Sequence, residues 1–113
     1  MANIVIKKGQ ENYIVVTVSD RSILNNPFNL IIFYNKFNPD VERSCVIENI
    51  SNNRLRYDEF IIEEISNPDN LEGQIFLLAG EWSYEIYESS IKTLDISDTT
   101  GVVLETGLVI VIE

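Results

Sequence analysis

The chain has 113 residues, of which 45% are hydrophobic, and it carries a formal charge of −10 from 18 acidic and 8 basic side chains. This length and hydrophobic content argue against intrinsic disorder and predict one domain, 1–113, with a packed core. The acidic balance argues against binding to nucleic acid or to an anionic membrane, because both need clustered Lys and Arg. Histidine is absent, which removes the commonest general base and zinc ligand.

Cys45 is the only cysteine, so no disulfide can form within the chain. It lies within a predicted strand and has no histidine to activate it, so we expect a buried small hydrophobe. The N-terminus lacks the basic-then-apolar order of a signal peptide, and no apolar run is long enough for a transmembrane helix. We therefore expect synthesis in a cytoplasm and a fold that depends on packing alone.

About seven or eight strands, separated by polar turns, are predicted along the chain. In chain order they are Ile4–Lys7, Tyr13–Ser19, Leu30–Asn35, Val41–Glu48, Arg56–Ile65, Gln74–Leu78, Glu81–Glu88 and Val102–Glu113. The second strand is apolar on both faces, which predicts a central position in a sheet. The chain ends within a strand, which can pair with its own sheet or with a neighbouring subunit. We expect an edge strand here, which would suit docking on a larger subunit.

The strand around the only Trp shows the strictest alternation. One face carries Trp82, Tyr84 and Ile86, and the other carries Glu81, Ser83 and Glu85. Leu78 and Gly80 precede Tyr84 at a spacing that suits a tyrosine corner, in which the Tyr hydroxyl hydrogen-bonds to the backbone. The pattern predicts an all-β fold, a single immunoglobulin-like β-sandwich of about seven to eight strands.

Carboxylates supply the candidates for acid–base or metal chemistry. The densest groups are Glu59, Glu63 and Glu64 on one strand and Glu81 and Glu85 on another. A glycosidase needs two carboxylates facing one cleft, whereas Glu81 and Glu85 share the face opposite Trp82 and are expected to be solvated. Asp95 and Asp98 offer oxygen ligands for calcium but lack the spacing of an EF-hand loop. We expect no catalytic, cofactor or metal site.

The aromatic side chains supply the candidates for binding. Trp82 could line a sugar-binding groove, but a core anchor is the favoured interpretation. Tyr87 faces away from Trp82 by alternation. Together with Tyr34, Phe37 and Tyr57 it could form an exposed contact patch.

Four pieces of the chain occur in the order and spacing of one protein family. They are Asn26-Pro27-Phe28-Asn29-Leu30-Ile31-Ile32-Phe33, Arg56-Tyr57-Asp58-Glu59-Phe60, Gly80 through Glu88, and Leu104-Glu105-Thr106-Gly107-Leu108-Val109-Ile110-Val111. Together they resemble the small immunoglobulin-like virion proteins of the crAss-like phages, tailed bacteriophages of Bacteroidetes, which are described as auxiliary or minor capsid proteins. The resemblance spans most of residues 26–111. Asn35-Lys36 departs from the family, in which an acidic residue often follows the Asn.

This resemblance implies a non-enzymatic virion structural protein, made in the host cytoplasm and located in the capsid, that docks on the major capsid protein. Other virion proteins and further copies of the chain are additional candidate partners, and the family brings no active site or cofactor. An acidic exterior suits a protein that decorates a shell rather than one that lines packaged DNA. The alternative is a glycan- or host-surface-binding module of a head fibre or tail. An enzyme that uses the Glu pairs is the least favoured interpretation.

Overall fold

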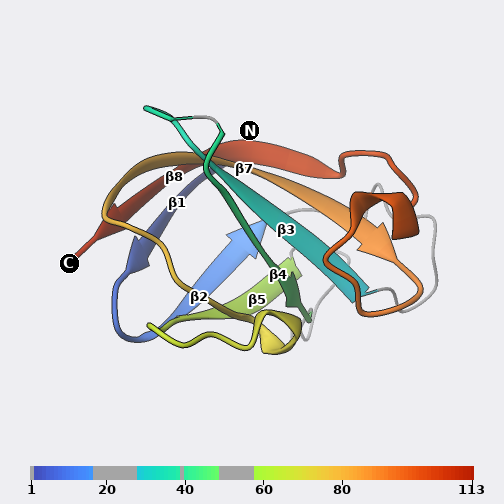
Figure 1. Cartoon of the computed structure of the whole chain (residues 1–113), viewed down its shortest axis with the longest axis horizontal. Helices are drawn as coiled ribbons and strands as arrows, with labels where there is room; N and C mark the ends of the chain where they lie inside the picture. The colour runs from blue at the N-terminus through green and yellow to red at the C-terminus, as the bar shows by residue number, and fades with distance from the viewer. Residues whose placement is uncertain (1, 17–27, 39, 49–57) are drawn as a thin grey trace.

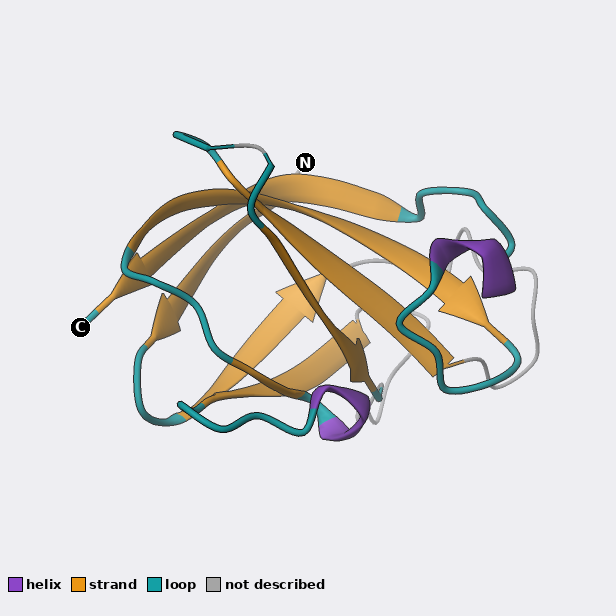
Figure 2. Ribbon diagram, in the orientation of Figure 1, coloured by secondary structure: helices purple, strands orange, loops and turns teal. Residues whose placement is uncertain are grey.

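The computed structural model describes residues 2–16, 28–38, 40–48 and 58–113, which form eight strands and two short 3-10 helices. The strands make two sheets that face each other as layers (Figure 1). One sheet has five strands in the order β1-β8-β7-β3-β4, and the other has three in the order β2-β5-β6. Figure 2 shows the two short helices in connecting segments, one between two strands of the three-stranded sheet and the other between two strands of the five-stranded sheet.

The elements follow the predicted strands closely. They are β1 (Ala2–Lys7), β2 (Glu11–Val16), β3 (Phe28–Asn35), β4 (Glu42–Ile47), β5 (Asp58–Glu64), η2 (Asn70–Glu72), β6 (Gln74–Ile75), β7 (Gly80–Ser89), η3 (Ile96–Asp98) and β8 (Glu105–Ile112). The adjacent strands β8, β7 and β3 match the G, F and C strands of an immunoglobulin sandwich, and β2 and β5 pair as its B and E strands do. The predicted all-β sandwich is confirmed.

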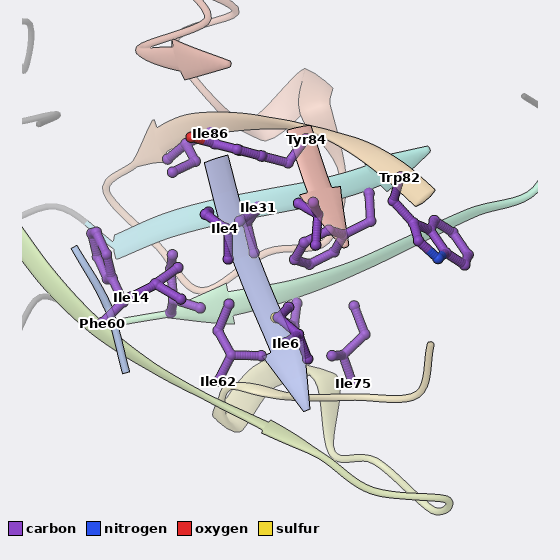
Figure 3. Packing of buried hydrophobic residues seen from close by; sticks show 14 of the residues in the cluster. Ile4, Ile6, Ile14, Ile31, Phe60, Ile62, Ile75, Trp82, Tyr84 and Ile86 are labelled. Atoms are coloured by element: carbon purple, nitrogen blue, oxygen red, sulfur yellow. The ribbon is translucent and has the colours of Figure 1, made fainter. Parts of the chain in front are cut away.

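The core lies between the two sheets and takes alternate residues from nearly every strand. Figure 3 shows the side chains of Ile4, Ile6, Ile14, Ile31, Phe60, Ile62, Ile75, Trp82, Tyr84 and Ile86, all of them buried. The strict alternation predicted for β7 is confirmed, since Trp82, Tyr84 and Ile86 point inward. None of the described residues that form this cluster is charged, so apolar burial is the main stabilising contribution.

The predicted positions of two strands within their sheets are wrong. The described part of the Tyr13–Ser19 strand is β2, which lies at an edge of the three-stranded sheet, while residues 17–19 lie outside the described residues. The C-terminal strand β8 is not an edge, because it lies between β7 and the N-terminal strand β1. The parallel β1–β8 pair joins the two ends of the chain, and this is a contact that local sequence cannot indicate.

The predicted tyrosine corner is also wrong in its hydrogen bond. Tyr84 is fully buried, but its hydroxyl has no hydrogen-bond partner among the described residues. Burial, with the nearby carboxylate of Glu105, raises the pKa of Tyr84. Instead, Nε1 of Trp82 donates to the carbonyl oxygen of Leu78 at 3.0 Å. The corner before β7 is therefore closed by the Trp side chain.

The edge strand β1 is closed at its end by a side chain from β2. The Asn12 side chain accepts a hydrogen bond from the Lys7 amide at 2.8 Å and donates one to the Lys7 carbonyl oxygen at 3.0 Å. The Asn12 side chain thus makes the two backbone hydrogen bonds to Lys7 that a neighbouring strand would otherwise make. Such capping blocks pairing with another chain at this end of the edge.

Candidate interaction surface

The carboxylates of β5 point to two different sides of the strand. Glu64 is buried, whereas Glu59 and Glu63 lie on the outer face. Glu64 accepts hydrogen bonds from the amides of Gly9 and Leu77 at 2.9 and 3.0 Å, and from Lys8 Nζ at 3.0 Å. Burial alone would raise the pKa of Glu64, but these bonds lower it on balance. Glu64 therefore joins the β1–β2 turn to the chain that follows β6.

Glu81 and Glu85 of β7 lie on the face opposite Trp82, as predicted, whereas Glu88 near the end of the strand is fully buried. Glu85 accepts hydrogen bonds from the hydroxyls of Tyr34 and Tyr87, each at 3.1 Å. Glu81 is exposed and lies 4.0 Å from Nζ of Lys36. Glu81 and Glu85 thus each have their own neighbours along the outer face of the five-stranded sheet.

The predicted exposed aromatic patch is not formed. Tyr87 is only 7% exposed and packs with Leu30 and Ile32, while Tyr34 packs against the same cluster. Burial, followed by the hydrogen bond to Glu85, raises the pKa of both tyrosines. Phe37 is exposed, and Tyr57 lies outside the described residues.

The segment between β7 and β8 lies against this cluster and holds its shape through its own hydrogen bonds. Ser89 Oγ donates to the carbonyl oxygen of Asp98 at 2.9 Å, and Thr93 Oγ1 donates to the Asp98 carboxylate at 2.8 Å. Asp95 accepts from the Ser97 amide at 2.9 Å and caps η3, which lowers the pKa of Asp95. Ile32 lines a cleft together with Thr93 and neighbouring residues of the segment. Both aspartates of the calcium hypothesis thus accept hydrogen bonds from their own loop. Within the described ranges, no three acidic or cysteine side chains converge as metal ligands.

Cys45 and Trp82 are core residues, as predicted. Cys45 is fully buried, and burial raises the pKa of its thiol to about 12. Trp82 is almost fully buried in the main core cluster. A sugar platform made by the Trp82 ring is therefore excluded.

The other half of the same outer sheet face is apolar and uncovered. We define the β1–β8 patch as Val5 (54% exposed), Leu108 (39%), Ile110 (49%) and Ile112 (38%). Val5 lies opposite Ile110 in the parallel β1–β8 register. The β1–β8 patch was not predicted from the sequence, although Leu108-Val109-Ile110-Val111-Ile112 is apolar at every position. A strand whose inner face enters the core has an apolar outer face when every residue is apolar.

A groove of about 300 Å³ runs along the β1–β8 patch. Its lining includes Val5, Leu108 and Ile110, together with the Lys36–Glu81 ion pair. The groove thus combines aliphatic walls with one opposed pair of charges. This combination suits an apolar side chain of a partner protein, with a polar contact beside it.

Comparison of the chain with protein-family models, curated proteins and solved structures finds no match. No helix in the described part of the chain is long and apolar enough to cross a membrane. The surface geometry is therefore the structural basis for assigning a function.

Proposed function

We propose that the protein is a non-enzymatic structural module that docks on a larger assembly through the β1–β8 patch. In this proposal the assembly is the capsid of a tailed phage. The protein is an auxiliary capsid protein, decorating or minor, bound to the major capsid protein. The single observation that carries the docking proposal is the uncovered strand pair that bears Val5, Leu108 and Ile110. Contiguous exposed apolar groups of this kind mark interaction sites.

The resemblance to the crAss-like phage proteins supports the choice of a capsid. The charge distribution is compatible with that choice, because a chain with a net charge of −10 repels its own copies and other acidic surfaces. Close approach is then favoured where the surface is apolar. Burial of the β1–β8 patch would orient the acidic remainder of the protein away from its partner.

A glycan- or host-surface-binding module of a fibre or tail is the alternative function. Such modules commonly stack a sugar on an exposed aromatic ring, and the only Trp of this chain is in the core. The exposed aromatic side chains in the described ranges are Tyr13 on β2 and Phe37 in the turn after β3. This alternative therefore lacks a shared aromatic platform in the described structure.

Mass spectrometry and cryo-electron microscopy of purified particles of the encoding phage test the capsid assignment. We expect a copy number that matches the head lattice, with the β1–β8 patch facing the major capsid protein. A few copies at the tail would favour the fibre function. Absence from the particle would refute both.

A matched pair of variants tests the patch itself. Ile110→Ser should abolish co-sedimentation with shells that lack the protein. Ile91→Ser should bind normally, because Ile91 is similarly exposed (53%) but lies outside the patch. Equal binding by both variants would refute docking through the β1–β8 patch, even if the protein is present in the capsid.

A further inference from the structure

The outer face of the three-stranded sheet carries a second uncovered apolar surface. Tyr13 and Val15 of β2 are 64% and 58% exposed. Ile61 of β5, half-buried, lies directly opposite Tyr13 in the antiparallel register. We call these three residues the β2–β5 face. It belongs to the other sheet from the β1–β8 patch, so a partner bound here is independent of the proposed function.

Carboxylates concentrate beside this face. Glu11 and Glu63 lie directly opposite each other in the β2–β5 register. Like charges at directly opposite positions of a sheet repel each other. Glu63 also accepts a hydrogen bond from Gln74 Nε2 at 3.0 Å, and Glu11 remains opposite it. A cation supplied from outside would reverse the effect of the pair.

A groove of about 250 Å³ adjoins the β2–β5 face. Ile61 lies in its lining together with four carboxylates, those of Glu11, Glu48, Glu63 and Glu72. Among the described residues, the one cation in this lining is Lys92. Its Nζ is already engaged by Glu72 at 3.0 Å. The groove therefore has a strong excess of negative charge next to an apolar surface.

We propose that the β2–β5 face binds an extended basic segment of another protein. Glu11, Tyr13 and Val15 follow one another at every second residue, and side chains of an extended partner repeat with the same period. The complementary segment has a Lys or Arg followed at the second and fourth positions by aliphatic residues. The cation enters the groove between Glu11 and Glu63, and the aliphatic side chains cover Tyr13 and Val15.

The negative charge of the groove favours a basic protein segment over nucleic acid, an anionic lipid surface or a second copy of this chain. Nucleic acid and anionic lipid surfaces carry the same sign as the groove. A second copy of this chain has a net charge of −10 and would bring further carboxylates to the groove. A basic protein segment satisfies both the carboxylates and the apolar residues beside them.

The test uses the full chain and a fluorescein-labelled probe peptide, Lys-Thr-Lys-Thr-Val-Thr-Val, in an anisotropy titration at low ionic strength. We expect saturable binding that weakens with added salt. The same peptide with Glu in place of Lys should not bind. NMR amide shifts caused by the basic peptide should concentrate on β2 and β5. Shifts centred on the five-stranded sheet would overturn the proposal.

Two double variants separate the groove from general charge attraction. Glu11→Gln/Glu63→Gln should weaken binding of the probe at least tenfold. Glu42→Gln/Glu113→Gln removes the same charge at exposed positions outside the groove and should weaken it less than threefold. Equal losses in both variants would show diffuse attraction and overturn the proposal.

Three further measurements keep the outcome decisive. Tyr13→Ser leaves the charge unchanged and should weaken binding several-fold, and an unchanged affinity would contradict the apolar part of the site. CaCl₂ alone should not shift the β2 and β5 amides. If calcium shifts them and the peptide does not, the groove is a cation site and the peptide proposal fails.

Because Glu11→Gln/Glu63→Gln removes a repulsive pair, its thermal midpoint should be equal to or above that of the wild type, so loss of binding cannot be attributed to unfolding.

Discussion

The outer face of the five-stranded sheet has two halves that differ in burial. On β3 and β7, Leu30 and Tyr87 are buried with the segment between β7 and β8 lying against their cluster. On β1 and β8, Val5 and Ile110 are about half exposed. Both halves carry large apolar side chains at alternate positions. The difference shows that residue type alone does not decide which half of this face is buried.

The covered half is completed by the chain itself, and the bare half is available to a partner. The Ser89–Asp98 hydrogen bond ties the segment between β7 and β8 to the end of β7. The bare half ends at the edge strand β1, where Asn12 binds the last residue of the strand and Glu64 binds the turn that follows it. The two halves should therefore respond differently to the same substitution.

Two leucines on the same face give the largest contrast. Leu30→Ala in the covered half should lower the free energy of unfolding by about 2–5 kcal/mol, because it leaves a cavity in a closed cluster. Leu108→Ala in the bare half should cost about 1 kcal/mol or less, since much of that side chain is already in water. Urea denaturation of both variants measures the difference. Similar losses would mean that the bare half is structural.

The bonds of Glu64 hold the edge of the bare half and depend on pH. Glu64→Gln should cost about 1.5–3 kcal/mol at neutral pH, as expected for hydrogen bonds to a buried charged group. Because folding lowers the pKa of Glu64, its contribution is present above the unfolded value of about 4.3. It is lost as pH falls through the folded pKa.

Urea midpoints measured from pH 7 to pH 3 test this dependence. The wild type should lose stability over that range more steeply than Glu64→Gln. Glu72→Gln removes an exposed ion pair of the same 3.0 Å length, to Lys92, and should change the midpoint little. Parallel curves for the wild type and Glu64→Gln would contradict the assignment.

Asn12 caps the β1 edge, and its removal should have a moderate effect. Asn12→Ala leaves the amide and carbonyl groups of Lys7 without this partner and should cost about 1 kcal/mol. It also opens the edge to pairing with another chain. Size-exclusion chromatography with light scattering should show more self-association than for the wild type. A monomeric variant of unchanged stability would show that the cap is dispensable.

Tyr84 lies on the inner face of β7, in the core behind this outer face, and should show the smallest effect. Because its hydroxyl has no partner within the described residues, Tyr84→Phe should change stability by less than about 0.5 kcal/mol or increase it. Trp82→Phe should cost more, since it removes the bond to Leu78 together with buried volume. Thermal unfolding of both variants compares them. A large loss of stability in Tyr84→Phe would indicate that the Tyr84 hydroxyl does make the hydrogen bond of a tyrosine corner.

Sequence alone located most strands and the inward side of several of them. Trp82 and Tyr84 alternate with charged or polar residues, and this two-residue period is a local property of the chain. For the same reason, the burial of Cys45 and the outward direction of Glu81 could be predicted. The candidate aromatic patch depended on the exposure of its members, which the sequence does not fix, and Tyr87 is buried.

Only the tertiary structure decided which apolar faces remain bare. The β1–β8 pair joins Ala2 to Gly107. The outer face of the sheet is buried on β3 and β7 but exposed on β1 and β8. Tyr13 and Val15 have the pattern of a central strand, yet β2 lies at an edge. A two-residue period in the sequence indicates which residues of a strand share a side. Whether a side is covered depends on contacts between residues far apart in the chain, and these contacts leave no local periodic signal.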